Sequence, residues 1–139
     1  MEQISESEKV ELKKTTSELK EGVISIASIL NKHQEGRLYF GIANDGKVIG
    51  QTVTENSLRE VSRAISDNIE PKIYPEVRKE KIEGKECIVV EFKGSNTPYF
   101  AYGRAYMRIT DENRPISPSE LKRMILKNKE QIWETSISE

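Results

Sequence analysis

The sequence is poor in the residues on which many active sites depend. Its 139 residues include one cysteine, Cys87, and one histidine, His33. A lone cysteine excludes an intramolecular disulfide and fits a reducing compartment, so we expect a cytoplasmic protein in which Cys87 is structural. A lone histidine gives no support to a histidine-based metal site or a Ser-His-Asp triad, and we expect His33 to lie on the surface near a helix end.

Nucleotide-binding and membrane signals are also missing. The sequence contains no G-x-x-x-x-G-K-[ST] phosphate loop and no dinucleotide fingerprint, so nothing in it supports ATP binding. No apolar run approaches the ~20 residues of a membrane helix, and the acidic start MEQISESEK is unlike a signal peptide, so we expect no membrane partner. The 22 basic and 23 acidic residues give a net charge of −1, which argues against a polybasic coat.

What the sequence does contain is centred on residues 36–50, GRLYFGIANDGKVIG. Leu38, Phe40 and Ile42 recur at every second position, which predicts a strand with one buried face. Residues 44–46, Asn-Asp-Gly, suit a tight hairpin turn, and residues 48–49 would begin the return strand. The hairpin would place Asp45 at its tip.

The remaining patterns predict short strands and three helices. Thr15, Thr54 and Ser117 have the sequence context of helix N-caps. Strands are expected at residues 9–13, with Glu11 on a charged face, and at 76–83, 86–93 and 104–109. We therefore predict an α+β fold, in which a mainly antiparallel mixed sheet of about six to seven short strands packs with three helices. The chain would form a single domain over 1–139, with flexible tails at about 1–8 and 134–139. One core should contain Leu19, Val23, Leu38, Phe40, Ile42, Leu58, Val90, Phe92 and Leu121.

Residues 104–109, RAYMRI, predict a binding face. Arg104, Tyr106 and Arg108 alternate with apolar residues and would share one side of a strand. Arginine pairs with phosphate in a bidentate manner, and an exposed tyrosine stacks on unpaired bases. The alternative is an ordinary solvated sheet face.

Glu6, Glu11 and Asp45 form a second candidate site. Convergent carboxylates can hold Mg²⁺ or Mn²⁺ beside a phosphodiester. Alternatively, Glu11 forms exposed ion pairs of little energetic value with its neighbours Lys9 and Lys13.

These motifs, taken in order, resemble a known family. SESEKVELKK is similar to the E-S-x-x-V-E-F-K opening of the AlbA-like DNA-binding domain, a module related to the Schlafen core. The hairpin of residues 36–50 resembles that family's G-G-x-L-x-x-G-V-x-D-x-G-x-I-x-G, and IEPKIYPEV, IVVEFKGSNTPYF and AYMRI are similar to its later motifs. The resemblance covers about residues 5–127. It departs at SILNKHQEG, where only Asn31 and Gly36 match, and at 110–111, where the family has a glycine.

The resemblance implies a fold and two activities. Bacterial relatives place the module ahead of a winged helix in transcriptional regulators. In nuclease-active Schlafen proteins a carboxylate triad cleaves transfer or ribosomal RNA with a divalent metal, and Glu6, Glu11 and Asp45 match that triad.

Three hypotheses follow. The first is a module that binds DNA or RNA without a cofactor and is the N-terminal part of a transcriptional regulator. Its contacts would come from Lys13, Lys14, Arg104, Tyr106 and Arg108. The second is an endoribonuclease for structured RNA that uses Mg²⁺ or Mn²⁺ at Glu6, Glu11 and Asp45. The third is a dimerisation or sensor module that binds a protein partner, including a second copy of the chain.

Overall fold

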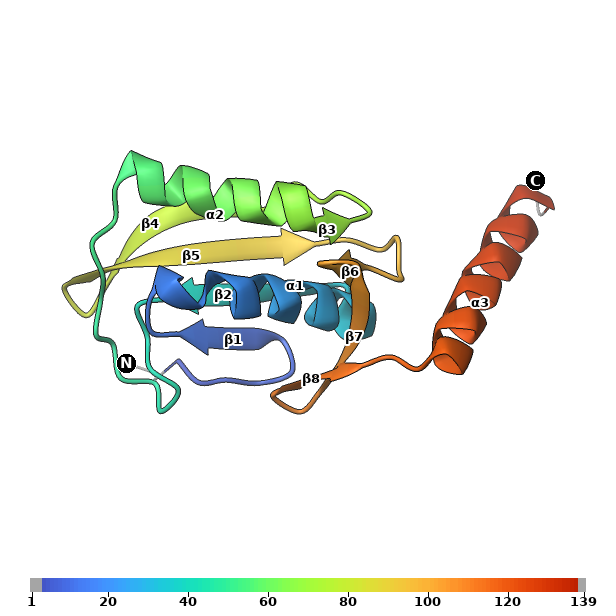
Figure 1. Cartoon of the computed structure of the whole chain (residues 1–139), viewed down its shortest axis with the longest axis horizontal. Helices are drawn as coiled ribbons and strands as arrows, with labels where there is room; N and C mark the ends of the chain where they lie inside the picture. The colour runs from blue at the N-terminus through green and yellow to red at the C-terminus, as the bar shows by residue number, and fades with distance from the viewer. Residues whose placement is uncertain (1–3, 138–139) are drawn as a thin grey trace.

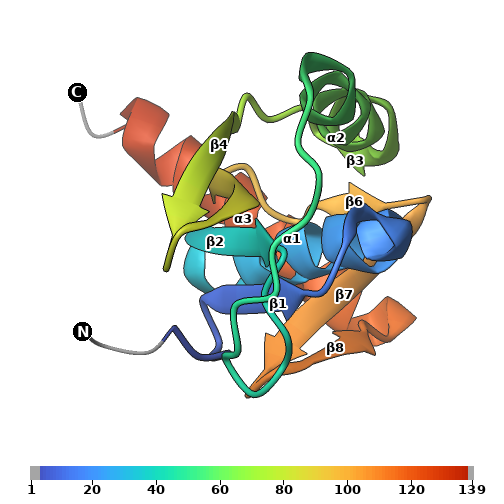
Figure 2. The same ribbon diagram turned by 90° about the vertical axis from the view of Figure 1, so that its left-hand side faces the viewer.

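Two four-stranded sheets lie on either side of helix α1 (Leu19–His33) in the computed structural model of the chain (Figure 1 and Figure 2). The structure describes residues 4–137, with side chains up to Lys129. The first sheet has the order β1-β2-β5-β4, with strands Val10–Lys13, Glu35–Phe40, Lys85–Lys93 and Glu76–Ile82. The second has the order β3-β6-β7-β8, with strands Ile69–Glu70, Phe100–Ala101, Arg104–Ile109 and Glu112–Pro115. Only β1 and β2 pair in parallel among these strands. The predicted α+β class is confirmed, although the strands form two sheets instead of one.

Two further α-helices complete the described fold. Helix α2 (Glu55–Asn68) contacts α1 and β4, and it begins at the capping box formed by Thr54 and Ser57. Helix α3 (Pro118–Ile137) starts with proline at its first position, as predicted. A short 3₁₀ turn, η1 (Thr16–Glu18), precedes α1 and is capped by the Thr15 side chain. None of the helices described is both long enough and apolar enough to cross a membrane.

The apolar core is divided by the first sheet. The larger cluster lies between this sheet and helices α1 and α2, and it includes Val23, Leu38, Phe40, Val90 and Phe92, with Leu19 and Leu58 packed against it. The smaller cluster consists of Leu12, Tyr39, Ile42, Val48, Cys87 and Val89. The prediction of one core is therefore wrong for Ile42, which belongs to the smaller cluster. It is also wrong for Leu121, which lies on α3 outside both clusters.

Gly41 explains why Ile42 changes sides. Its φ of +109° lies in a region that favours glycine, and strand β2 ends one residue earlier at Phe40. The predicted return strand is reduced to a single bridge between Ile42 and Val48. The alternation of side chains is broken at this point, and Ile42 points to the same cluster as Tyr39.

Gly36 marks a close approach between β1 and β2. A Cβ atom added at this residue would lie 2.6 Å from the carbonyl oxygen of Lys9 and 2.7 Å from Cγ2 of Ile29. Because the first contact is with backbone, a side chain at Gly36 would push β1 away from β2.

Candidate functional site

A buried ion pair joins the first and the last parts of the fold. Glu11 of β1 faces α1, and its Oε2 accepts a hydrogen bond of 3.0 Å from Nη1 of Arg108 on β7. Arg108 is 0% exposed and Glu11 is 4% exposed. Two opposite charges buried together in this way stabilise each other, and removing one would leave the other uncompensated.

Polar neighbours supply further hydrogen bonds to the pair, although Nε of Arg108 is buried without a partner among the described residues. Ser25 of α1 donates to Oε2 of Glu11 at 2.6 Å, and the Leu12 backbone N–H donates to Oε1 at 3.1 Å. Asn113 of β8 accepts from Arg108 Nη1 at 2.9 Å and donates to the Ser25 hydroxyl at 2.8 Å. The four side chains Glu11, Ser25, Arg108 and Asn113, which we call the ion-pair cluster, thus form a closed network.

Arg108 also holds the N-terminal segment in place. Its Nη2 donates to the carbonyl oxygens of Ser7 at 2.9 Å and Val10 at 3.2 Å. Nearby, Glu8 accepts from the Thr110 backbone N–H and lies 2.7 Å from Nε2 of His33. Residues 7 and 8, expected to be part of a flexible tail, are therefore in contact with β7 and α1.

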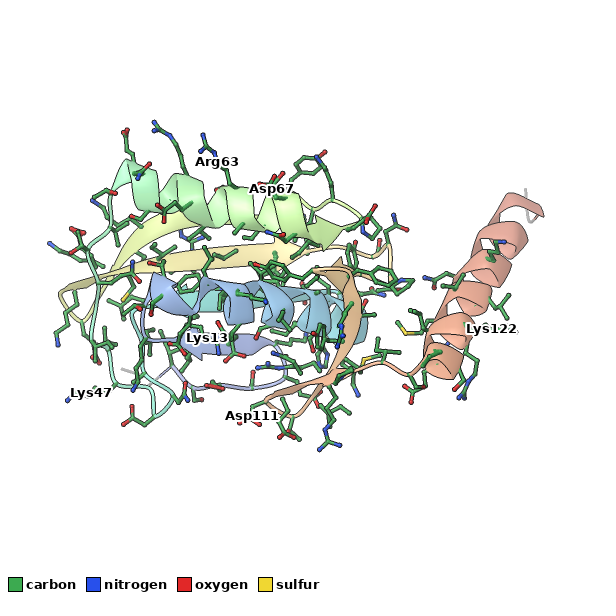
Figure 3. All side chains as sticks on the ribbon, viewed as in Figure 1. Lys13, Lys47, Arg63, Asp67, Asp111 and Lys122 are labelled. Carbon is green, nitrogen blue, oxygen red and sulfur yellow. The ribbon has the colours of Figure 1, made fainter. Side chains whose placement is uncertain are left out.

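Glu6 lies beside the ion-pair cluster. Burial, the negative charge of Glu11 and a side-chain hydrogen bond with Glu11 raise the pKa of Glu6 to about 7, while Arg108 opposes this shift. Asp111, at the exposed turn between β7 and β8 (Figure 3), raises the pKa further. Near neutral pH, the Glu6 carboxyl is therefore protonated in a substantial fraction of the molecules.

This arrangement fits a guanidinium better than a metal ion. Both oxygens of Glu11 already accept hydrogen bonds, one of them from Arg108. Asp45 lies on the exposed turn after β2, where its Oδ1 accepts from the Lys47 backbone N–H at 2.9 Å. Within the part of the chain that the structure describes, no three carboxylate, imidazole or thiol groups are placed to hold a metal ion. The structure thus brings Glu6 and Glu11 together without adding Asp45 to them.

The predicted binding face on β7 needs one correction. Arg104 is exposed and Tyr106 is half-buried, but Arg108 is not on the surface. The prediction that Arg108 contacts phosphate is wrong in this structure, because β1, α1 and β8 enclose its guanidinium. Of the two predicted lysines, Lys14 is exposed, whereas Lys13, at the end of β1 (Figure 3), is half-buried.

A cationic and aromatic surface replaces the predicted one at the β6–β7 turn. The Lys20 ammonium of α1 lies 5.3 Å from the centroid of the Tyr102 ring, which is 38% exposed. Exposed Arg104 follows two residues later, and neither cation takes part in an ion pair among the described residues. Burial and the nearby Glu21 carboxylate raise the pKa of Tyr102, so the phenol is neutral at physiological pH. We call Lys20, Tyr102 and Arg104 the hairpin surface.

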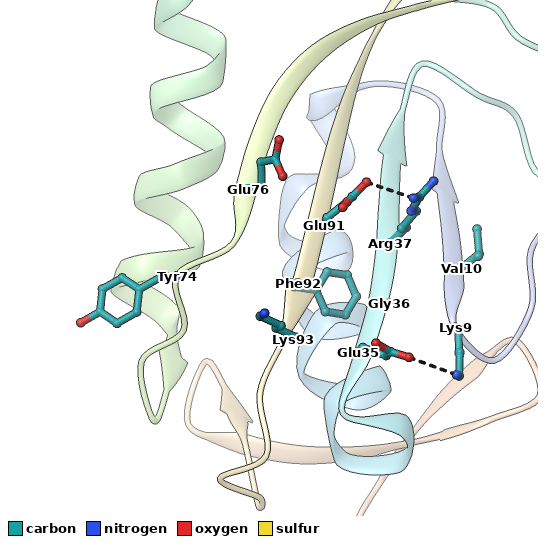
Figure 4. Close-up of a pocket in the computed structure, with 10 residues that line it drawn as sticks. All are labelled: Lys9, Val10, Glu35, Gly36, Arg37, Tyr74, Glu76, Glu91, Phe92 and Lys93. Carbon is teal, nitrogen blue, oxygen red and sulfur yellow. Dashed lines mark hydrogen bonds and ion pairs between the residues drawn. The ribbon is translucent and has the colours of Figure 1, made fainter.

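A cleft lies elsewhere, at the outer surface of the first sheet (Figure 4). It encloses about 630 Å³ and is bordered by the exposed Tyr74. Its charges largely cancel, since Arg37 pairs with Glu91 at 3.1 Å and Lys9 pairs with Glu35 at 3.5 Å. This balance gives the cleft no clear preference for an anionic or a cationic ligand.

Sequence reasoning missed Ser25 and Asn113 of the ion-pair cluster and Lys20 of the hairpin surface. Ser25 had a signal, because a serine between Val23 and Ile26 interrupts an apolar helix stripe. Lys20 had none, because its partner Tyr102 is more than 80 positions away. Asn113 lies five residues from Arg108, but its bond to Ser25 spans 88 positions.

The comparisons agree with this fold. Residues 6–117 match the model of the family described as "Schlafen, AlbA_2". No curated protein matches the sequence. Among solved structures, the DIP2311 protein from Corynebacterium diphtheriae is similar, with a TM-score of 0.65 and 17% identity. The match covers 82% of this chain but only 23% of that protein.

A second similar structure is the N-terminal domain of a RecG-related protein from Nitrosomonas europaea, whose name links it to ATP-dependent DNA helicases. It has a TM-score of 0.57, 19% identity and 82% coverage of both chains. At these identities the two structures support the fold alone. The family match covers most of the chain, including all members of the ion-pair cluster and the hairpin surface, and this chain therefore belongs to the Schlafen, AlbA_2 family.

Proposed function

We propose that this chain is a nucleic-acid-binding module that needs no metal for binding. The observation that carries the proposal is the hairpin surface, where the Lys20 ammonium lies 5.3 Å from the exposed Tyr102 ring and exposed Arg104 follows two residues along the chain. Neither cation has a described ion-pair partner. Cations attract phosphates, and a tyrosine ring stacks on an unpaired base. Lys14 and Tyr106 are retained from the sequence-based proposal, and half-buried Lys13 is a secondary candidate.

One similarity supports a role with nucleic acid, and another concerns the length of the chains in which the fold occurs. The chain shares its fold with a domain of a protein whose name refers to DNA helicases. It also spans only 23% of the DIP2311 protein, so the fold occurs within longer chains, as expected for one module of a larger transcriptional regulator.

The test compares two pairs of substitutions by fluorescence anisotropy with single-stranded and duplex oligonucleotides. Lys20→Ala with Arg104→Ala should weaken binding and make log K less dependent on log salt, by about 2 in slope, because two phosphate contacts are lost. Arg59→Ala with Arg63→Ala on exposed positions of α2 is the control with the same charge change and should bind like the wild type. Equal affinity of both double variants would show that the hairpin surface is not the binding site.

A metal-dependent endoribonuclease is the second candidate, and the closeness of Glu6 and Glu11 favours it. Structured transfer RNA would be incubated with Mg²⁺ or Mn²⁺ and wild type, Glu11→Gln or Asp45→Asn. Cleavage by the wild type that both variants lose would establish the nuclease. Because Arg108 already neutralises Glu11, we expect no cleavage and no thermal stabilisation of the wild type by Mn²⁺.

A further inference from the structure

Helix α3 stands apart from the rest of the fold (Figure 1). Its described attachment to the body is made by Asn128, whose side chain donates to the carbonyl oxygen and, at 3.1 Å, to the hydroxyl of Thr97. Leu121 and Met124 are half-buried, as is Asn128. These three residues mark the side of α3 that faces the body, and the opposite side is open to solvent.

Over residues 121–129, whose side chains the structure describes, the open side of α3 carries only positive charge. Lys122, Arg123, Lys127 and Lys129 are all exposed, and at about 100° per residue they occupy an arc of roughly 160° (Figure 3, where Lys122 is labelled). No acidic residue occurs between positions 121 and 129. None of the four cations forms an ion pair with a described residue. We call them the α3 arc.

Helix α2 shows that charge of a single sign is not a general property of the exposed helices in this molecule. Its cations Arg59 and Arg63 alternate with Glu55, Glu60 and Asp67, and Arg59 pairs with Glu55 at 3.6 Å. The charges on α2 therefore nearly cancel, whereas those on the α3 arc add together.

We infer that the α3 arc binds the phosphate backbone of a nucleic acid, as a second contact separate from the hairpin surface. The inference rests on the proposed function and extends it. Residues 122–129 span about 10 Å along the helix, which matches on the order of six phosphate charges of a duplex. Leu126, which is 49% exposed, is the one apolar side chain within the arc, so the arc is too polar to enter a lipid bilayer. Charge complementarity thus selects a hydrated polyanion.

The experiment measures the salt dependence of duplex DNA and RNA binding by the full chain. In one variant, Lys122, Arg123, Lys127 and Lys129 are all changed to Gln, which keeps a good helix former at each position. The control variant changes Arg59, Arg63, Lys79 and Lys81, which are exposed on α2 and β4, to Gln. Both variants lose four positive charges, and circular dichroism would confirm that both keep their helices.

The α3 variant should bind on the order of tenfold or more weakly near 0.1 M salt, and its slope of log K against log salt should be less steep by roughly 3 to 4. The control should follow the wild type. Binding by the α3 variant that equals the wild type or the control would overturn this inference and leave the hairpin surface intact. Absence of binding by the wild type would overturn the proposed function as well.

Two parallel measurements test whether a membrane or a second copy of the chain binds the α3 arc instead. If vesicles containing phosphatidylserine bind the wild type and not the α3 variant, while nucleic-acid binding is unchanged, the arc is a membrane contact. If sedimentation shows a dimer that only the α3 variant loses, the arc is a contact between two copies. Either result would contradict the assignment to phosphate.

Discussion

Arg104 and Arg108 lie four residues apart on the same strand and point to the same face, yet their surroundings are opposite. Arg104 follows the β6–β7 turn and is exposed, whereas Arg108 is enclosed by β1, α1 and β8 and is 0% exposed. One guanidinium is available to a ligand, and the other is already bound to a carboxylate, an amide and two backbone carbonyls. Residue type and strand parity are therefore insufficient to assign function, and the depth of each position in the fold decides it.

The largest expected difference is in stability. Arg108→Ala should lower the free energy of unfolding by about 3–5 kcal/mol, because Glu11 would remain buried without its partner. Arg104→Ala should change it by no more than about 0.5 kcal/mol. Urea unfolding of both variants measures the contrast. A similar loss of unfolding free energy in Arg108→Ala and Arg104→Ala would mean that Arg108 is not the central cation of the ion-pair cluster.

A smaller effect is expected for Asn113→Ala. Asn113 links Arg108 to the Ser25 hydroxyl, so its removal leaves two buried groups with one partner fewer and should cost about 1–3 kcal/mol. Asn96→Ala on the exposed loop after β5 is a suitable control, because only its backbone N–H forms a described hydrogen bond. If Asn113→Ala leaves the free energy of unfolding unchanged, water replaces the Asn113 amide as partner of Arg108 and Ser25.

The smallest effect concerns pH. The pKa of Glu6 is raised from its ordinary value of 4.5 to about 7, so the folded state holds a proton that the unfolded state has released between these values. Folding stability from this group is therefore complete below about pH 4.5 and is lost as the pH rises through 7. The melting temperature of the wild type should decline from pH 5 to pH 8, and Glu6→Gln should flatten the decline.

Glu8 and Glu91, by contrast, have lowered pKa values, because Glu8 accepts a hydrogen bond from the Thr110 backbone and Glu91 accepts one from Arg78. Their contributions to stability are present above about pH 4.5 and are lost only in acid, so they do not vary between pH 5 and 8. If the melting temperature falls equally steeply with pH in the wild type and in Glu6→Gln, Glu6 is excluded as the titrating group.

Local pattern predicted much of the fold and less of the site. The hairpin of β4 and β5, the N-cap at Thr54 and the proline start of α3 depend on residues close in sequence, and all three are confirmed. The alternation at Val10 and Leu12 also predicted β1. It could not show that Glu11 faces α1, because that depends on where α1 and β7 pack.

The site required contacts between distant segments. One alternative from the sequence paired Glu11 with Lys9 and Lys13, but Lys9 pairs with Glu35 and Arg108 takes the place beside Glu11. Arg108 looked like a surface residue because alternation shows which residues share a face and not what covers that face. Arg104 is on the same face but is exposed, since it is the first residue of β7 and follows the β6–β7 turn.

The contacts of Arg108 also have a consequence for the order in which the chain is made. Arg108 binds Glu11 and the Ser7 carbonyl across separations of 97 and 101 residues. During synthesis, β1 and α1 leave the ribosome long before their cation does, and Glu11 must stay hydrated until β7 arrives. β1 itself can pair with β2 earlier, but the segment before it is among the last parts to be secured. A nascent chain ending before Arg108 would keep that N-terminal segment loose.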